Sequence, residues 1–151
     1  MLYAAISLIV LLLDQASKFY AVKLLKENSP IVILDNFLQL TYVENFGAAF
    51  GILQNKKIFF IVITTIVVVG IIFYMKSNIS LTSSMKVALA LVIGGAIGNL
   101  LDRIRLGYVV DFIDFKFWGL YDFPVFNIAD SSIVIATIAI CYLVIFNKYE
   151  I

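Results

Sequence analysis

The sequence contains no histidine and only one cysteine among its 151 residues. Without histidine, the chain cannot build a Ser-His or Cys-His nucleophile pair or an HExxH zinc site. The single cysteine, Cys141, lies inside an apolar run and cannot form an internal disulfide. Because no histidine or cysteine cluster is available to hold a metal ion, we expect neither a metal nor a cofactor. Acid–base chemistry in this chain would therefore depend on carboxylates.

Charged residues are also scarce. They make up 14% of the sequence, whereas 63% is hydrophobic, and the mean hydropathy is +1.05. A soluble domain of this length would be far more polar, so we expect an integral membrane protein that forms one domain over residues 1–151. The net charge of +1 gives no reason to expect a nucleic-acid partner.

Four apolar runs are long enough to cross about 30 Å of hydrocarbon as helices. They cover residues 2–25, 57–75, 85–104 and 130–146. The two longer connections share one side of the membrane. In the first connection, residues 37–43 alternate weakly and are typical of a short strand. In the second, the aromatic-rich residues 114–123 indicate a segment at the membrane–water interface, and an aromatic belt with no other task is an equal alternative.

Ionisable residues occur inside two of these apolar runs. Asp14 and Lys18 are four residues apart and therefore share one face of a helix. Taken alone, they could be a self-neutralising pair that lets the helix insert. Asn99, Asp102 and Arg103 share a face of another helix, where the charged pair could simply mark the helix end. Two helices that each present an acid and a base suggest a common polar cavity.

Two further acids lie near the ends of apolar runs. Asp111 follows the third run by a few residues, and Asp130 opens the fourth. A carboxylate at the edge of a bilayer is costly and is usually functional. Asp130 could equally favour a helix N-terminus, three residues after Asn127. Asn45, which precedes a glycine- and alanine-rich stretch, could be only a turn residue.

Together, the segments that contain these residues resemble the lipoprotein signal peptidases (signal peptidase II), which are aspartyl peptidases of the bacterial inner membrane. The resemblance covers nearly the whole chain in order. It consists of DQASK at 14–18, NFGAAF at 45–50, GAIGNLLDR at 95–103, VVDF at 109–112 and FNIADS at 126–131.

The resemblance implies an all-α membrane fold: four transmembrane helices with a small extracytoplasmic β-structure and an interfacial helix. It implies an endopeptidase that removes signal peptides from diacylglyceryl-modified prolipoproteins by cutting before the lipidated cysteine. Asp111 and Asp130 would be the catalytic residues. The residues that would bind substrate or support the site are Asp14, Lys18, Asn45, Asn99, Asp102, Arg103 and Asn127.

The resemblance also implies an orientation and partners. Both termini would be cytoplasmic, with the site facing outward from the bacterial inner membrane. The Lys/Arg count alone favours the opposite orientation, because more cations lie in the two longer connections than on the side of the termini. We expect a monomer whose partners are membrane lipids and the lipid-modified prolipoprotein.

The main alternative is a small transporter or proton-conducting protein with an intramembrane relay of ionisable groups. That function predicts charges spread along the membrane depth. Here the polar residues concentrate toward one side, and the run at 57–75 has no charge in its interior. A Ser–Lys hydrolase using Ser17 and Lys18 is disfavoured because adjacent helix residues point about 100° apart.

Overall fold

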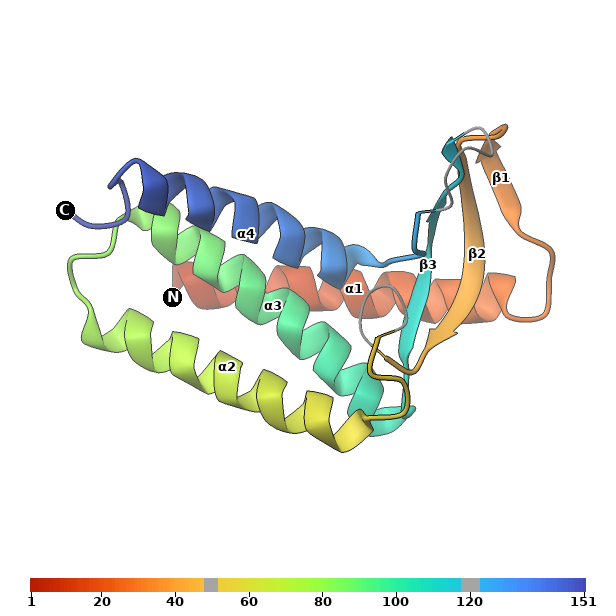
Figure 1. The fold of residues 1–151 in the computed structure, drawn as a ribbon, viewed down its shortest axis with the longest axis horizontal. Helices are drawn as coiled ribbons and strands as arrows, with labels where there is room; N and C mark the ends of the chain where they lie inside the picture. Colours follow the sequence, from red (N-terminus) through yellow and green to blue (C-terminus); the bar gives the residue numbers. More distant parts are fainter. Residues whose placement is uncertain (48–51, 118–122) are drawn as a thin grey trace.

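Four helices lie side by side at one end of the molecule, and a small sheet stands across the other end (Figure 1). The computed structural model describes residues 1–47, 52–117 and 123–151. The elements in chain order are α1 (Leu2–Leu25), β1 (Ile31–Leu34), β2 (Leu38–Asn45), α2 (Lys57–Ser77), α3 (Ser83–Arg105), β3 (Val109–Phe115) and α4 (Ile128–Ile145). All four helices of the described residues are long and apolar enough to cross a membrane, which confirms the predicted helices. The three strands pair into one small sheet, which confirms the predicted β-structure.

Side-chain caps explain why two helices begin earlier than predicted. The Thr82 hydroxyl oxygen accepts a hydrogen bond from the Met85 backbone N–H at 3.3 Å, so α3 starts at Ser83. Asn127 and Asp130 form a reciprocal capping box, in which each side chain accepts from the other residue's backbone N–H. Helix α4 therefore starts at Ile128, and Asp130 lies inside its first turn.

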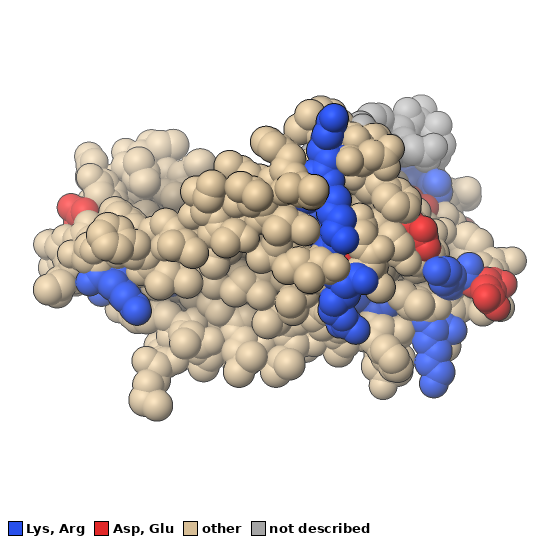
Figure 2. Space-filling model, turned by 90° about the horizontal axis from the view of Figure 1, so that it is seen from below, with Lys and Arg blue, Asp and Glu red and all other residues tan. Residues whose placement is uncertain are grey.

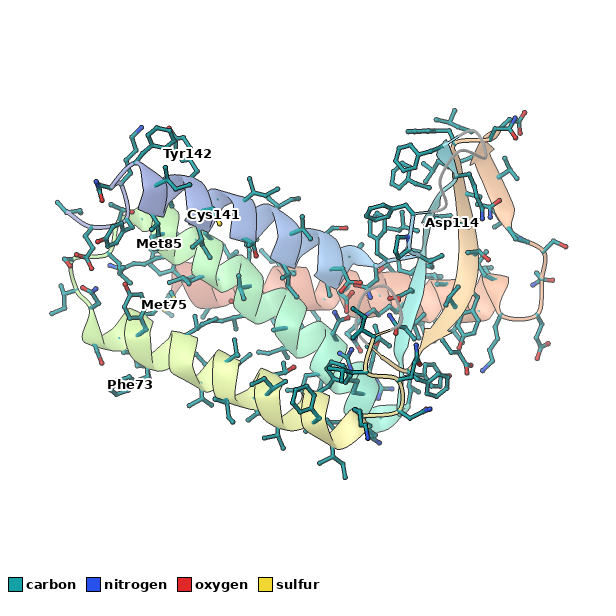
Figure 3. The ribbon with its side chains drawn as sticks, in the orientation of Figure 1. Phe73, Met75, Met85, Asp114, Cys141 and Tyr142 are labelled. Carbon is teal, nitrogen blue, oxygen red and sulfur yellow. The ribbon has the colours of Figure 1, made fainter. Side chains whose placement is uncertain are left out.

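The exposed surface of the helices matches a hydrocarbon environment. Phe73 projects outward from α2 and is 71% exposed, whereas Met75 and Met85 fill the space between α2 and α3 (Figure 3). Figure 2 shows a broad band without charged atoms between two groups of charged side chains. This distribution fits a slab of lipid around the middle of the bundle.

Helix α3 is the central helix, and glycines allow its neighbours to approach closely. A Cβ atom on Gly95 would lie 2.5 Å from the Ala129 carbonyl oxygen of α4. One on Gly98 would lie 2.5 Å from Asp14 Oδ2 of α1. Small residues are the usual means of bringing membrane helices together. Here they bring α1 and the start of α4 to the same turn of α3.

Replacing Gly98 by alanine is expected to destabilise the protein by about 1–3 kcal/mol, because the buried Asp14 carboxylate must move. Gly70→Ala is the matched control, since a Cβ at Gly70 meets nothing within 4 Å. The control should unfold at the wild-type temperature or slightly above it. Thermal unfolding in detergent measures both variants, and equal melting temperatures would contradict the close approach.

The sheet is antiparallel, with the order β1-β2-β3. Val110 and Phe112 of β3 pack with Ala21 and Leu25, which attaches the sheet to the end of α1. Side chains alternate between the two faces of a strand, so Asp111 points to the opposite face. The β2–β3 register pairs Asp111 with Val43. The sheet therefore presents Asp111 on the face away from α1.

The aromatic-rich second connection differs from the predicted interfacial segment. Asp114 and Phe115 belong to β3, because they pair with Gln39 and Leu38 of β2. Residues 118–122 lie outside the described part of the chain, and the described residues contain no interfacial helix. The strand predicted at 37–43 is confirmed as β2.

Candidate active site

Asn127 connects the two aspartates that the sequence singled out. Its side-chain Nδ2 donates to Asp111 Oδ1 at 2.6 Å. Its backbone N–H donates to Asp130 Oδ2 at 3.3 Å, and its Oδ1 accepts from the Asp130 backbone N–H at 2.9 Å. Asn127 is completely buried, so one buried residue hydrogen-bonds to both carboxylates.

The remaining carboxylate oxygens of the pair also accept amide hydrogen bonds. Asn45 Nδ2 donates to Asp111 Oδ2 at 2.9 Å, and Asn99 Nδ2 donates to Asp130 Oδ1 at 2.7 Å. Three asparagines from β2, α3 and the start of α4 thus orient two acids from β3 and α4. A fully satisfied network of this kind restricts the carboxylates to one arrangement.

Both aspartates line a cavity of about 770 Å³. Its walls are polar near the pair, where Asn45, Asn99 and Arg103 also face it, and largely apolar elsewhere. The apolar wall includes residues 123–126 and 133–135. On α4, Val134 and Ile135 are more than half exposed on the surface that would meet lipid. A ligand with a polar, hydrogen-bonding part and an apolar part would fit this cavity.

Asp111 is suited to holding a proton near neutral pH. Burial raises the pKa of its carboxyl group from 3.8 to about 7, and the negative charge of Asp130 acts in the same direction. The hydrogen bonds from Asn45 and Asn127 and the positive charge of Lys18 oppose this increase in the Asp111 pKa. Because two carboxylates that share a site do not both ionise cheaply, one proton can be shared between them.

Asp14, Lys18 and Asp102 form a separate buried cluster behind the cavity, which we call the buried triad. Lys18 Nζ lies 2.9 Å from Asp14 Oδ2 and 2.9 Å from Asp102 Oδ2. It also donates to Asn99 Oδ1 at 2.8 Å. A self-neutralising pair within α1 is therefore an incomplete interpretation, because the cation also joins α1 to α3. The charged faces of α1 and α3 meet in this buried cluster, whereas Asn99 and Arg103 are the residues of α3 that line the cavity.

Arg103 has a different environment from its neighbour Asp102. Its Nη2 donates to the Gly47 carbonyl oxygen at 2.9 Å, and its guanidinium lies 4.7 Å from the centre of the Phe60 ring. Since Asp102 pairs with Lys18 instead, the interpretation of Asp102 and Arg103 as a simple helix-end pair is wrong. Arg103 fastens the first connection to α3 at the cavity wall.

Sequence reasoning missed Gln15. Its Nε2 donates to Asp14 Oδ2 at 3.2 Å and to Asp102 Oδ1 at 3.0 Å. An amide side chain inside an apolar run, next to Asp14, was the available signal. Among the described residues, in contrast, the Ser17 hydroxyl donates only to the Asp14 carbonyl oxygen of its own helix, which gives no support to a Ser–Lys pair.

These features define a membrane-spanning protein that carries, at one end of its helical bundle, two aspartates hydrogen-bonded to the same asparagine. The chain belongs to the signal peptidase II family, because the family model described as "Signal peptidase (SPase) II" matches residues 6–146. The family consists of aspartic peptidases, and its members process lipoprotein precursors. The transporter alternative has no support from these similarities.

Individual relatives are similar over most of their length. The lipoprotein signal peptidase of Caldanaerobacter subterraneus subsp. tengcongensis is 54% identical over 140 residues, which is 91% of this chain and 92% of that one. The protein of the same name from Halothermothrix orenii is 49% identical over 138 residues, 90% of each chain. A solved structure described as "Bacterial membrane enzyme structure by the in meso method at 2.3 A resolution" is 37% identical, with a TM-score of 0.89 over 97% of this chain and 88% of that one.

Proposed function

We propose that Asp111 and Asp130 are the catalytic pair with which this peptidase removes signal peptides from lipid-modified prolipoproteins. One observation carries the proposal: Asn127 holds both carboxylates at the polar end of a cavity whose other walls are apolar. The names of the similar proteins support the substrate class, because each is a lipoprotein signal peptidase.

The chemistry follows from a shared proton. The ionised aspartate accepts a proton from a water molecule, whose oxygen attacks the scissile carbonyl carbon. The protonated aspartate donates a hydrogen bond to the carbonyl oxygen as that oxygen becomes negative. The C–N bond then breaks, and a proton passes from the pair to the leaving amine. The amide donors of Asn45, Asn99 and Asn127 keep the two carboxylates in place throughout.

Activity is expected to fall as the pH rises above about 7. The Asp111 pKa is raised from 3.8 to about 7, so the pair loses its shared proton over this upper range. Because the Asp111 pKa is 3.8 in the unfolded chain and about 7 in the folded protein, the unfolded chain releases this proton at a lower pH. The contribution of Asp111 to the free energy of unfolding therefore decreases between pH 3.8 and about 7. Measurement of kcat/KM against pH tests the expected fall in activity. A profile that stays flat up to about pH 9 would contradict it.

The depth of the pair supports a lipid-anchored substrate. Asp130 lies in the first turn of α4, and Asp111 follows the end of α3 by six residues. A peptide bond next to a lipidated cysteine would be held at the same level of the bilayer. Acyl chains that contact the apolar wall at 133–135 would contribute about 0.8 kcal/mol per buried CH₂. Membrane lipids would occupy this wall when substrate is absent.

We also propose that both termini are cytoplasmic and that the pair faces outward from the bacterial inner membrane. The opposing Lys/Arg count is weakened because several cations at the sheet end have local partners. Lys26 pairs with Glu44 at 3.1 Å, and Lys116 pairs with Asp114 at 3.4 Å. A reporter active only in the cytoplasm, fused after Ile151, tests this orientation, and a silent reporter on a folded fusion would exclude it.

The substrate assignment is tested with the purified protein in detergent and a chelator. A precursor peptide carrying a diacylglyceryl cysteine should be cut immediately before that cysteine, as determined by mass spectrometry. The same peptide without lipid is the control. Equal turnover of the two peptides would exclude lipid recognition. We expect the active form to be a monomer, and size analysis of the active fraction tests this.

A further inference from the structure

Asp14 binds the backbone immediately before one of the paired aspartates. Its side chain is fully buried, and its Oδ1 accepts a hydrogen bond from the Ala129 backbone N–H at 3.0 Å. The first N–H groups of a helix have no partner within the helix. A carboxylate from α1 therefore caps α4 at the residue that precedes Asp130.

Asp102 makes the equivalent contact to the strand that carries the other aspartate. Its Oδ2 accepts a hydrogen bond from the Val110 backbone N–H at 3.2 Å. Val110 is 1% exposed, and the next residue is Asp111. The two carboxylates of the buried triad thus bind equivalent backbone positions. Asp14 binds Ala129, the residue before Asp130, and Asp102 binds Val110, the residue before Asp111.

Lys18 joins these two contacts. Its Nζ is 2.9 Å from Asp14 Oδ2 and 2.9 Å from Asp102 Oδ2, so one cation sets the spacing of both acids. The same Nζ donates to Asn99 Oδ1. The Asn99 oxygen must therefore face Lys18, which turns the Asn99 amide NH₂ toward Asp130.

We propose that Asp14, Lys18 and Asp102 form a clamp that sets the separation and orientation of the Asp111 and Asp130 carboxylates. The clamp acts through backbone N–H groups and through Asn99, not by contact with substrate. This proposal rests on the proposed function of the aspartate pair. The triad members are positioning residues, because none of them is among the residues that line the cavity.

Asparagine and alanine variants at Asp102 separate positioning from a purely structural role. Asp102→Asn keeps an oxygen that can accept from the Val110 N–H, whereas Asp102→Ala removes the acceptor. A misplacement of about 1 Å can cost about 100-fold in rate. We expect Asp102→Ala to lower kcat by about 100-fold and Asp102→Asn by about 10-fold or less, with KM within about threefold of wild type. Asp14→Asn should also lower kcat more than it changes KM.

Ser17→Ala is the matched control, because Ser17 lies between the triad members on α1 and, within the described part of the chain, its hydroxyl donates only to a carbonyl oxygen of its own helix. It should retain the wild-type kcat and KM. Rates are referred to the folded fraction, which is measured by thermal unfolding of the same samples. If Asp14→Asn does not fold, Gly98→Ala provides the second variant, because its Cβ would displace Asp14 Oδ2.

Three outcomes would overturn the clamp: wild-type kcat in a folded Asp102→Ala variant, equal losses in the asparagine and alanine variants, or a loss confined to KM. A loss of kcat with the expected order, alanine larger than asparagine, supports it. Failure of the proposed function is distinguishable, because it would appear as turnover by Asp111→Asn or Asp130→Asn.

Discussion

Replacing Asp111 or Asp130 by asparagine, each alone, is expected to lower turnover of a lipidated precursor by about 10³-fold or more. An amide can neither take a proton from water nor pass a shared proton to the leaving amine. General acid–base catalysis alone contributes about 10²–10⁴-fold, and members of one catalytic unit fail together when either is removed. Measurement of product formation by mass spectrometry gives the loss.

Both variants should fold and insert normally. An asparagine at Asp111 retains one acceptor oxygen for the amide donors of Asn45 and Asn127. Removal of the buried negative charge also relieves the unfavourable burial that raises the Asp111 pKa. Wild-type melting temperatures combined with lost turnover would therefore identify a chemical role. Substantial turnover by either folded variant would disprove the catalytic pair.

Lys18→Met is expected to destabilise the protein more than any other single substitution in the buried triad. The side chain is buried and is the common partner of Asp14 and Asp102. Methionine preserves the apolar stem but leaves two buried carboxylates facing each other without a cation. Removal of one partner from a buried ion pair usually costs about 3–5 kcal/mol. Thermal or denaturant unfolding in detergent measures this loss.

Lys23→Met is the control, because it removes the same charge from the same helix. Lys23 lies in the last turn of the same helix, α1, and is exposed. Substitution of an exposed lysine should change the free energy of unfolding by less than about 0.5 kcal/mol. If the two methionine variants unfolded at the same temperature, the triad would not be a stabilising cluster.

Asp130 illustrates why residue patterns left alternatives open. The sequence allowed either a helix cap or a catalyst, and the structure shows that the two roles are compatible. One oxygen, Oδ2, accepts from the Asn127 backbone N–H in the capping box, whereas Oδ1 accepts from Asn99. A pattern of residues three apart indicates only that they share a helix face. It does not indicate which oxygen remains available at the cavity.

The glycines of α3 show the same limit. A Cβ on Gly95 would lie 2.5 Å from the Ala129 carbonyl oxygen, and one on Gly98 would lie 2.5 Å from Asp14 Oδ2, so α4 and α1 both approach α3 closely. That Gly98 makes room for a carboxylate instead of an apolar side chain was not predictable. The partner is 84 residues away in the chain (98 − 14), and its position depends on how α1 packs against α3.

Composition and hydropathy by themselves determined that this chain forms four membrane-crossing helices without histidine-dependent chemistry. Those properties are local, because the transfer of each apolar run into hydrocarbon depends on its own residues. Tertiary structure alone decided which polar groups meet. Asp14 reaches Ala129, and Asn127 reaches Asp111, only when α1, α3, α4 and β3 pack together. Buried polar groups must find partners wherever packing places them, so the geometry of the aspartate pair is a property of the whole fold.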